Sequence, residues 1–284
     1  MNLKPHARSR VQLKVAELLD KGMSRHQVAK KLKVPPGTVA SAKREMSKRA
    51  KLKDGPNNSV VGIIGDTHIP YENKNYLDFC CDVFAKAGVT RVIHIGDLID
   101  NHSLSFHDSE PGLRGSKGEY MDARSRLEPW YDAFPDLTLI YGNHDAIPAR
   151  QMKKVGLDPD LYMRPLEVVY QMPTGWSVQS ELEIDGVLYH HGHTACGVNG
   201  FRNDSKKRFQ STVTGHAHGN SGVSYTATRR ELVYGCAVGC GIDNSSMAFA
   251  YGKHFAQKPI ISCAVVSENG TLPQVTPMPL KWIK

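Results

Sequence analysis

The stretch Val60-Val61-Gly62-Ile63-Ile64-Gly65-Asp66-Thr67-His68 decides the fold of the larger part of the chain. Its first six residues form a nearly continuous apolar run, which is typical of a strand buried on both faces. The run ends at three polar residues. Parallel strands of α/β proteins carry their functional side chains at their carboxyl ends. We therefore predict a strand over 60–65 and a functional site that begins at Asp66.

The same arrangement recurs twice along the chain. Helical spacing over about 76–86 precedes the strand-like run 91–95, which ends at Gly96-Asp97-Leu98-Ile99-Asp100. Helical spacing over about 119–134 precedes the run 137–141, which ends at Gly142-Asn143-His144-Asp145. Three βα repeats with polar strand ends predict an α/β sheet with its site along one edge.

The second half of the chain has a different pattern. Residues 183–189 contain an Asp-Gly turn between apolar residues, which predicts a hairpin ending at His190-His191-Gly192-His193. The segment Thr214-Gly215-His216-Ala217-His218-Gly219 follows, and β-type segments occupy 232–238 and 260–266. These segments predict a second, more antiparallel sheet packed on the first.

Five short motifs follow these strand-like runs in a fixed order. They are Asp-x-His, Gly-Asp-x-x-Asp, Gly-Asn-His-Asp, His-Gly and Gly-His-x-His. Each alone is weak, because a lone Gly-Asp is usually a turn and a lone histidine is usually a packed residue. Together, over about residues 60–265, they closely resemble the calcineurin-like metallophosphoesterase family. The resemblance implies an α/β fold, a two-sheet sandwich flanked by helices.

The resemblance also implies two bound metal ions and their ligands. His191 is chosen over its neighbours His190 and His193 because the ligand of the family immediately precedes glycine. Oxygen and imidazole ligands without a thiolate favour Mn²⁺, with Fe, Zn, Co or Ni as alternatives. The implied ligands are Asp66, His68, Asp97 and His218 for the first metal, and Asp97, Asn143, His191 and His216 for the second.

The resemblance further implies a catalytic arrangement around these metals. A hydroxide that bridges the metals is the expected nucleophile. His144 follows a candidate ligand without being one, so it is the candidate general acid, and Asp100 is expected to orient its ring. His102 and His193 are the candidate substrate contacts.

The N-terminal segment differs from the rest in charge. Residues 1–54 contain 15 Lys or Arg and four Asp or Glu, a net charge of +11. The whole chain carries +8, so the remainder carries −3. A basic block joined to a mildly acidic body favours a separate module with a polyanionic partner. We predict a basic domain over 1–54, a linker over 55–59 and a catalytic domain over 60–284.

Helical spacing in this segment predicts three short helices. The second opens at Ser24 and has Val28, Ala29 and Leu32 on its inner face. The run 29–39 then resembles the helix-turn-helix family over about residues 8–50, in which the following helix lies in the DNA major groove. The alternative is a solvated basic bundle that docks only onto protein. The resemblance makes candidate nucleic-acid contacts of Thr38, Ser41, Lys43, Arg44 and Lys48.

One difference between this sequence and the pattern of the family bears on the substrate class. Protein phosphatases of the family continue Gly-Asp-x-x-Asp with Arg-Gly, whereas this chain continues with Asn101-His102. Loss of the guanidinium fork argues against a protein phosphatase. The DNA-repair nucleases of the family also lack this Arg-Gly, and a nucleic-acid-binding module suits a nuclease, so we expect phosphodiester hydrolysis on nucleic acid, with DNA favoured. The alternatives are a small-molecule phosphatase or cyclic-nucleotide phosphodiesterase, and a DNA-binding protein with a vestigial metal site.

Two further expectations concern the environment of the chain. The N-terminus lacks the apolar segment of a signal peptide, and no apolar run has the length of a membrane span, so we expect a cytoplasmic protein. The six cysteines lack the paired Cys-x2-Cys spacing of structural zinc, and we expect reduced, mostly buried thiols. The compact fusion of two modules is similar to fusions found in bacteriophage genomes, by analogy alone.

Overall fold

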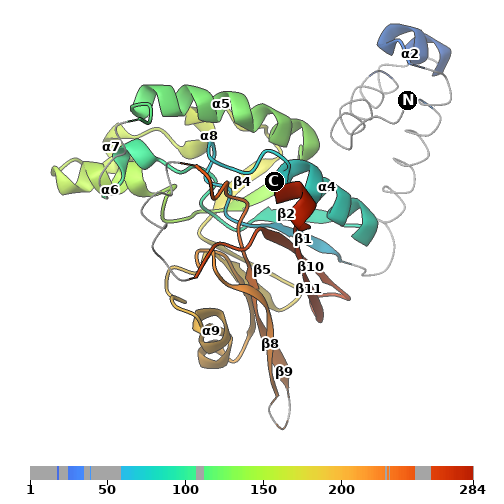
Figure 1. Cartoon of the computed structure of the whole chain (residues 1–284), viewed down its shortest axis with the longest axis vertical. Helices are drawn as coiled ribbons and strands as arrows, with labels where there is room; N and C mark the ends of the chain where they lie inside the picture. The colour runs from blue at the N-terminus through green and yellow to red at the C-terminus, as the bar shows by residue number, and fades with distance from the viewer. Residues whose placement is uncertain are drawn as a thin grey trace. The chain divides into compact units, whose positions relative to one another are not determined.

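The computed structural model describes residues 18, 25–34, 39, 59–106, 112–227, 229, 231–246 and 257–283. The chain divides into two compact units, residues 1–58 and residues 59–284. Figure 1 shows the elements of both units. Each unit has its own buried core, and each is considered by itself below.

In the first unit the structure describes one complete helix, α2 (Arg25–Leu32). Val28 and Ala29 of this helix are buried and pack with Leu18 and Val39, both helical. The predicted second helix with Val28 and Ala29 on its inner face is therefore confirmed. The candidate contacts Thr38, Ser41, Lys43, Arg44 and Lys48 lie outside the described residues.

The second unit contains a six-stranded sheet in the order β11-β10-β1-β2-β3-β4. Strands β1 (Val61–Ile64), β2 (Arg91–His94), β3 (Leu137–Ile140) and β4 (Trp176–Gln179) run parallel to one another, while β10 (Ser262–Ser267) is antiparallel to both of its neighbours, β1 and β11 (Leu272–Pro277). All four residues of β1 are buried, as its apolar run predicts. The three predicted βα repeats are confirmed.

One strand was assigned to the wrong sheet by its sequence. The segment 260–266 was expected in the second sheet, but β10 pairs with β1, placing Val61 opposite Val266. Because five of its six residues are buried, β10 can occupy a position covered on both faces. Strands β4 and β11 were not predicted.

The second sheet has the order β5-β6-β7-β9-β8. Its strands are β5 (Glu181–Ile184), β6 (Val187–His190), β7 (Ser211–Thr214), β8 (Ser221–Ala227) and β9 (Leu232–Val238). The predicted hairpin is β5-β6, and its turn residues Asp185 and Gly186 have φ of 53° and 76°, as a type I′ turn requires. The sheet is mixed rather than mainly antiparallel, since β7 runs parallel to both β6 and β9.

Helices cover the outer faces of the two sheets (Figure 1). Helices α4 (Tyr76–Ala87) and α5 (Ser116–Ala133) pack on the first sheet, and both were predicted. Helix α9 (Gly200–Arg208) packs on β9 so closely that a Cβ at Gly235 would meet the carbonyl oxygen of Phe201. The shorter elements are η1 (His102–Leu104), α6 (Ile147–Lys154), α7 (Pro159–Tyr162), α8 (Leu166–Val169) and α10 (Leu280–Ile283). Among the described helices, none is long and apolar enough to cross a membrane.

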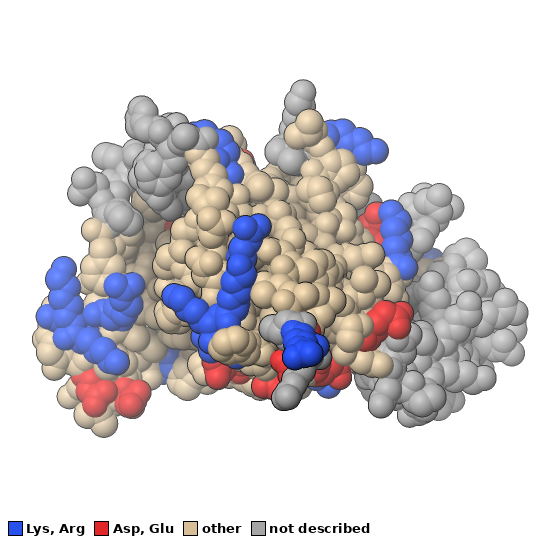
Figure 2. Space-filling view, turned by 90° about the horizontal axis from the view of Figure 1, so that it is seen from below, with Lys and Arg blue, Asp and Glu red and all other residues tan. Residues whose placement is uncertain are grey.

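Charged side chains of both signs share the surface of the second unit (Figure 2). A group of Lys and Arg side chains lies at the left end of this view, the side on which Figure 1 places α6. The exposed cations of α6 are Arg150, Lys153 and Lys154. This helix begins two residues after the Gly142-Asn143-His144-Asp145 motif.

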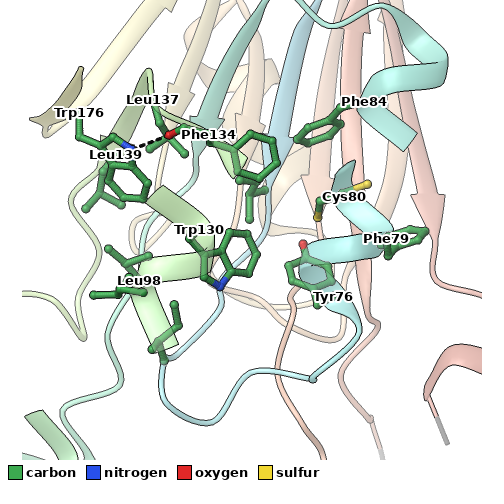
Figure 3. Close-up of a cluster of buried hydrophobic side chains, with 14 of the residues drawn as sticks. Tyr76, Phe79, Cys80, Phe84, Leu98, Trp130, Phe134, Leu137, Leu139 and Trp176 are labelled. Atoms are coloured by element: carbon green, nitrogen blue, oxygen red, sulfur yellow. Dashed lines mark hydrogen bonds between the residues drawn. The ribbon is translucent and has the colours of Figure 1, made fainter. Parts of the chain in front are cut away.

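Two apolar layers hold the second unit together. One lies between the first sheet and helices α4 and α5, where Trp130, Phe134 and Leu139 pack together (Figure 3). The indole N–H of Trp176 donates to the Phe134 carbonyl oxygen at 2.7 Å. The other layer lies between the two sheets. Alternation along β1 serves both, because Ile64 enters the first layer and Ile63 the second.

We expect Leu127→Ala to lower the free energy of unfolding by about 2–5 kcal/mol, because it empties a fully buried position between α5 and the first sheet. Met121→Ala is the matched control, since Met121 lies on the same helix and is 57% exposed. The measurement is urea unfolding followed by tryptophan fluorescence, because all three tryptophans lie in residues 59–284. Equal losses in both variants would contradict this assignment of the core.

Candidate metal centre

The candidate ligands all follow the carboxyl ends of strands. Because β1, β2 and β3 are parallel, their carboxyl ends lie at one edge of the first sheet. Strands β6 and β7 are parallel in the second sheet and add their ends to the same site. The residues that follow these strands are Asp66 and His68 after β1, Asp97 after β2, Asn143 and His144 after β3, His191 after β6, and His216 and His218 after β7.

The structure brings the seven sequence-predicted ligands together in two adjoining clusters. One consists of Asp66, His68, Asp97 and His218, and the other contains Asp97, His191 and His216, with their ligand atoms within 4.8 Å of one another in each cluster. The side-chain oxygen of Asn143 lies 2.8 Å from His191 Nε2 and completes the second cluster. Asp97 belongs to both clusters, which is the position that a bridging carboxylate would occupy.

Hydrogen bonds on the side away from the cluster determine which ring nitrogen two of the candidate ligand histidines direct at it. His68 Nδ1 lies 2.6 Å from Asp100 Oδ1, and His191 Nδ1 lies 3.1 Å from the Ile95 carbonyl oxygen. A carboxylate and a carbonyl can only accept, so both Nδ1 atoms carry a proton, and Nε2 is the ring nitrogen that each histidine would offer to a metal ion. These two Nε2 atoms face Asp97 Oδ2, at 3.5 Å from His68 and 3.3 Å from His191.

Such an arrangement of acceptors is unfavourable without a cation between them. His68 Nε2 and His218 Nε2 also approach to 3.1 Å, while Asp66 Oδ1 is buried and has no hydrogen-bond partner. Buried acceptors without donors are rare unless an ion completes them. Imidazole nitrogens and carboxylate oxygens converging in two adjacent groups suit divalent transition metals. The residues present therefore fit two metal ions.

The pKa values of the clustered residues also indicate a site for positively charged ions. Although burial opposes its charged form, Asp97 and Asp66 raise the pKa of His191 to about 10. Burial likewise opposes ionisation of Asp97, but His191 and His68 hold its pKa well below the ordinary range. The raised pKa of His191 and the lowered pKa of Asp97 both show that positive charge next to this carboxylate is favourable. A bound metal would supply that charge.

Glycines of the motifs leave room for the ligands. A Cβ at Gly142 would collide with the backbone nitrogen and Oδ1 of Asp97, and a Cβ at Gly215 would collide with Asp66 Oδ1. The backbone is also strained here, since His68, Asp97 and His216 have φ of 50°, 51° and 63°. Non-glycine residues adopt this region rarely, and functional sites are where such strain concentrates.

His144 lies at the edge of the first cluster. Its Nδ1 donates to the Asp100 carbonyl oxygen at 2.7 Å and lies 3.4 Å from the Asp100 carboxylate. Asp100 therefore orients His144 mainly through its backbone, while its carboxylate makes the shorter contact with His68. His102 is buried, with Nδ1 3.9 Å from Asp100 Oδ2, so three histidines surround one carboxylate.

The neighbours of His191 have different environments. His190 points to the opposite face of β6, where its Nε2 contacts Asp204 of α9 at 2.8 Å. His193 is exposed, and its ring centroid lies 6.3 Å from that of His191. The cysteines are mostly buried, as expected, but Cys196 is exposed, and its sulfur lies 3.7 Å from His216 Nε2.

Sequence reasoning gave no role to two buried carboxylates that shape the site. Asp145 accepts from the backbone N–H groups of Ile99 and Gly142 at 3.0 and 2.9 Å, which ties the loops after β2 and β3 together. Glu119 accepts from His102 and Ser103 N–H groups at 2.7 and 2.9 Å. The role of Asp145 could have been predicted, because it is the last residue of the Gly-Asn-His-Asp motif. Glu119 lies in helix α5 and belongs to no recognisable motif, so nothing in the sequence indicated its role.

Comparison with known proteins gives one family. The family model described as calcineurin-like phosphoesterase matches residues 59–238. A search of curated proteins found no match.

Three solved structures illustrate the structural similarity. Vacuolar Protein Sorting 29 from Cryptosporidium parvum is 13% identical with a TM-score of 0.40, over 78% of this chain and 97% of that one. The phosphoesterase Yfce from E. coli is 13% identical with a TM-score of 0.38, over 74% and 88%. A putative diadenosine tetraphosphatase is 16% identical with a TM-score of 0.34, over 78% and 95%.

We expect Asp97→Asn to lower the metal content sharply and to abolish hydrolysis, because a neutral amide cannot compensate two cations. The measurement is metal bound per chain after incubation with Mn²⁺ and desalting, by inductively coupled plasma mass spectrometry. Circular dichroism checks that the fold persists. Two retained metals and unchanged turnover would remove Asp97 from the bridging position.

Gly142→Ala should also reduce metal content, although it removes no ligand, because the added methyl group displaces Asp97. Gly115→Ala is its matched control, since a Cβ there meets nothing within 4 Å. Normal metal binding by Gly142→Ala would show that Asp97 need not occupy its observed position.

Proposed function

The chain belongs to the calcineurin-like phosphoesterase family, and we propose that it is a metal-dependent phosphodiesterase that cleaves nucleic acid. The observation that carries the reaction class is the pair of ligand clusters sharing Asp97, with a histidine that is not a ligand beside them. When bound, two divalent metals supply Lewis-acid charge and lower the pKa of a water that becomes the nucleophile. Mn²⁺ is the proposed metal.

The residues around the metals prepare the site for an anion. Asp66 and Asp97 carry two negative charges between them, fewer than two divalent cations bring, so the occupied site is positive. Asp100 and the Ile95 carbonyl orient the rings of His68 and His191, which keeps their Nε2 atoms directed at the cluster. A phosphodiester anion is attracted to this charge and positioned for attack.

His144 is proposed to protonate the leaving oxygen. Its Nδ1 is committed to the Asp100 carbonyl oxygen, which leaves Nε2 as the atom able to deliver a proton. Burial opposes the charged ring, but Asp97 and Asp100 raise the pKa of His144 above its ordinary value. Its side chain is 22% exposed, so a substrate can reach it.

The residue after Asp100 supports a diester rather than a phosphomonoester. Asn101 has φ of 53°, and its amide donates to the His144 carbonyl oxygen at 2.9 Å. This position therefore supports the loop of the general acid instead of gripping phosphate with a guanidinium fork. A phosphodiester carries one negative charge and needs less compensation than a phosphomonoester dianion.

The charge of residues 1–54 supports nucleic acid as the substrate. A block of +11 next to a body of −3 suits a polyanion, and neutralisation of phosphates dominates the affinity of such contacts. A helix-turn-helix is proposed for this segment, with Lys43 and Arg44 among its contacts. DNA is the proposed target.

We expect His144→Ala to keep its metals but to lose about 10²–10⁴-fold in kcat on a dinucleotide, whose leaving alkoxide needs a proton. Bis(p-nitrophenyl) phosphate has a better leaving group and should lose far less. Because a general acid must be protonated, wild-type turnover of the dinucleotide should fall as pH rises through the pKa of His144. That alkaline limb should be absent from the variant. Equal losses on both substrates, or loss of metal, would contradict the role.

Deletion of residues 1–55 should leave turnover of bis(p-nitrophenyl) phosphate almost unchanged, because every candidate ligand lies beyond Ser59. Duplex DNA affinity should fall, and its salt dependence should weaken by roughly 0.9 in the slope of log K against log salt for each lost phosphate contact. Fluorescence anisotropy of a labelled duplex across a salt series measures both. The double substitution Lys43→Ala with Arg44→Ala should reproduce part of the loss. If the slopes of log K against log salt are the same for the full-length and the truncated protein, a small-molecule phosphoesterase is favoured instead.

A further inference from the structure

An exposed aromatic ring with two cations over it lies where the segment after η1 meets α6. Phe106, just beyond η1, is 46% exposed. Arg150 Cζ lies 4.7 Å and Lys154 Nζ lies 5.5 Å from its ring centroid. Both cations come from α6, and a cation this close to an aromatic face is attracted to it.

The two cations have no carboxylate partner in the described part of the chain. Arg150 and Lys154 are exposed, and among the described residues neither forms an ion pair. Other basic side chains of the unit do have carboxylate partners, as Arg126 does with Glu72 at 2.8 Å. An exposed aromatic ring flanked by two positive charges that have no carboxylate partner among the described residues suits a ligand that is both flat and anionic.

Hydrogen bonds connect this cluster to the metal centre. The Gln151 amide donates to the Leu104 carbonyl oxygen at 2.6 Å, which joins α6 to η1. The Asn101 amide joins the start of η1 to His144. Phe106 comes six residues after Asp100, so its backbone lies at most about 22 Å from that of Asp100. The ring is therefore within a few nucleotides of the candidate cleavage site.

We propose that Phe106, Arg150 and Lys154 form a stacking site for one base of a single-stranded nucleic acid whose neighbouring phosphodiester enters the metal centre. The base stacks on the Phe106 ring, and Arg150 and Lys154 contact the adjacent phosphates. This inference rests on the proposed nuclease activity and adds to it the strand form of the substrate. Aromatic stacking is tolerant of sequence, because every base has a flat face. Loss of one stacked base lowers affinity about 5- to 150-fold.

The kinetic test compares oligothymidylates that contain one abasic residue at successive positions. With the wild-type full chain and Mn²⁺, one abasic position should lower kcat/KM about 5- to 150-fold. In Phe106→Ala the intact oligonucleotide should already show this loss, and the abasic residue should cost nothing more. Phe106→Trp should restore the dependence on the base, whereas Phe106→Leu should not. Phe209→Ala is the matched control, since Phe209 is 73% exposed at the end of α9.

A binding measurement tests the same site without turnover. In metal-free Phe106→Trp, single-stranded oligothymidylate should quench the emission of the introduced indole, and an oligonucleotide with an abasic residue at the sensitive position should quench it less. Wild-type protein, with three native tryptophans, supplies the baseline.

Three outcomes separate this inference from the proposed function. Cleavage of oligonucleotides with a flat abasic profile and no quenching overturns the stacking site alone. An equal loss by Phe106→Ala on bis(p-nitrophenyl) phosphate also overturns it, because the ring would then only support the catalytic loop. Base-dependent quenching without any cleavage supports the stacking site and overturns the nuclease activity.

Discussion

The second unit is arranged around one buried carboxylate that faces the Nε2 atoms of two imidazole rings. Asp97 is 1% exposed, and a carboxylate and a carbonyl oxygen on the outer side hold the Nδ1 protons of His68 and His191 in place. Three acceptors at such distances repel one another unless a cation lies among them. The geometry of the strand ends, the motif glycines and the strained loops can all be understood as the means of holding these groups in place.

The supporting structure is made of carboxylates that do not contact a metal position. Asp100 orients His68, Asp145 ties two strand ends together, and Glu119 secures the backbone at His102. Each is buried, and each acts through hydrogen bonds that a neutral side chain of similar size would make less strongly. Burial raises the pKa of Asp100 and of Asp145 to about 6. These groups explain how ligands from five strands of two sheets keep one geometry.

Sequence patterns located the strands that carry the ligands, because buried parallel strands such as β1 are short apolar runs with polar ends. They failed where pairing depends on distant partners. The run of β10 has the same composition whether it pairs with β1 or within the second sheet, and only the folded arrangement decides. The candidate ligands could be named from five motifs, whereas the cluster at Phe106 joins two segments 44 residues apart and follows no pattern. The role of Glu119 was not predicted, because nothing in the sequence of its helix indicates that its carboxylate accepts from the backbone N–H groups of His102 and Ser103.

The site also connects the two sheets of the unit. The backbone N–H of His216, after β7, donates to Asp66 Oδ2, after β1, at 2.7 Å. A ligand that binds only the folded state stabilises it in proportion to the logarithm of its concentration. Metal bound across this edge would therefore stabilise the contact between the two sheets. The resistance of the folded unit to proteolysis would then depend on the supply of divalent cations.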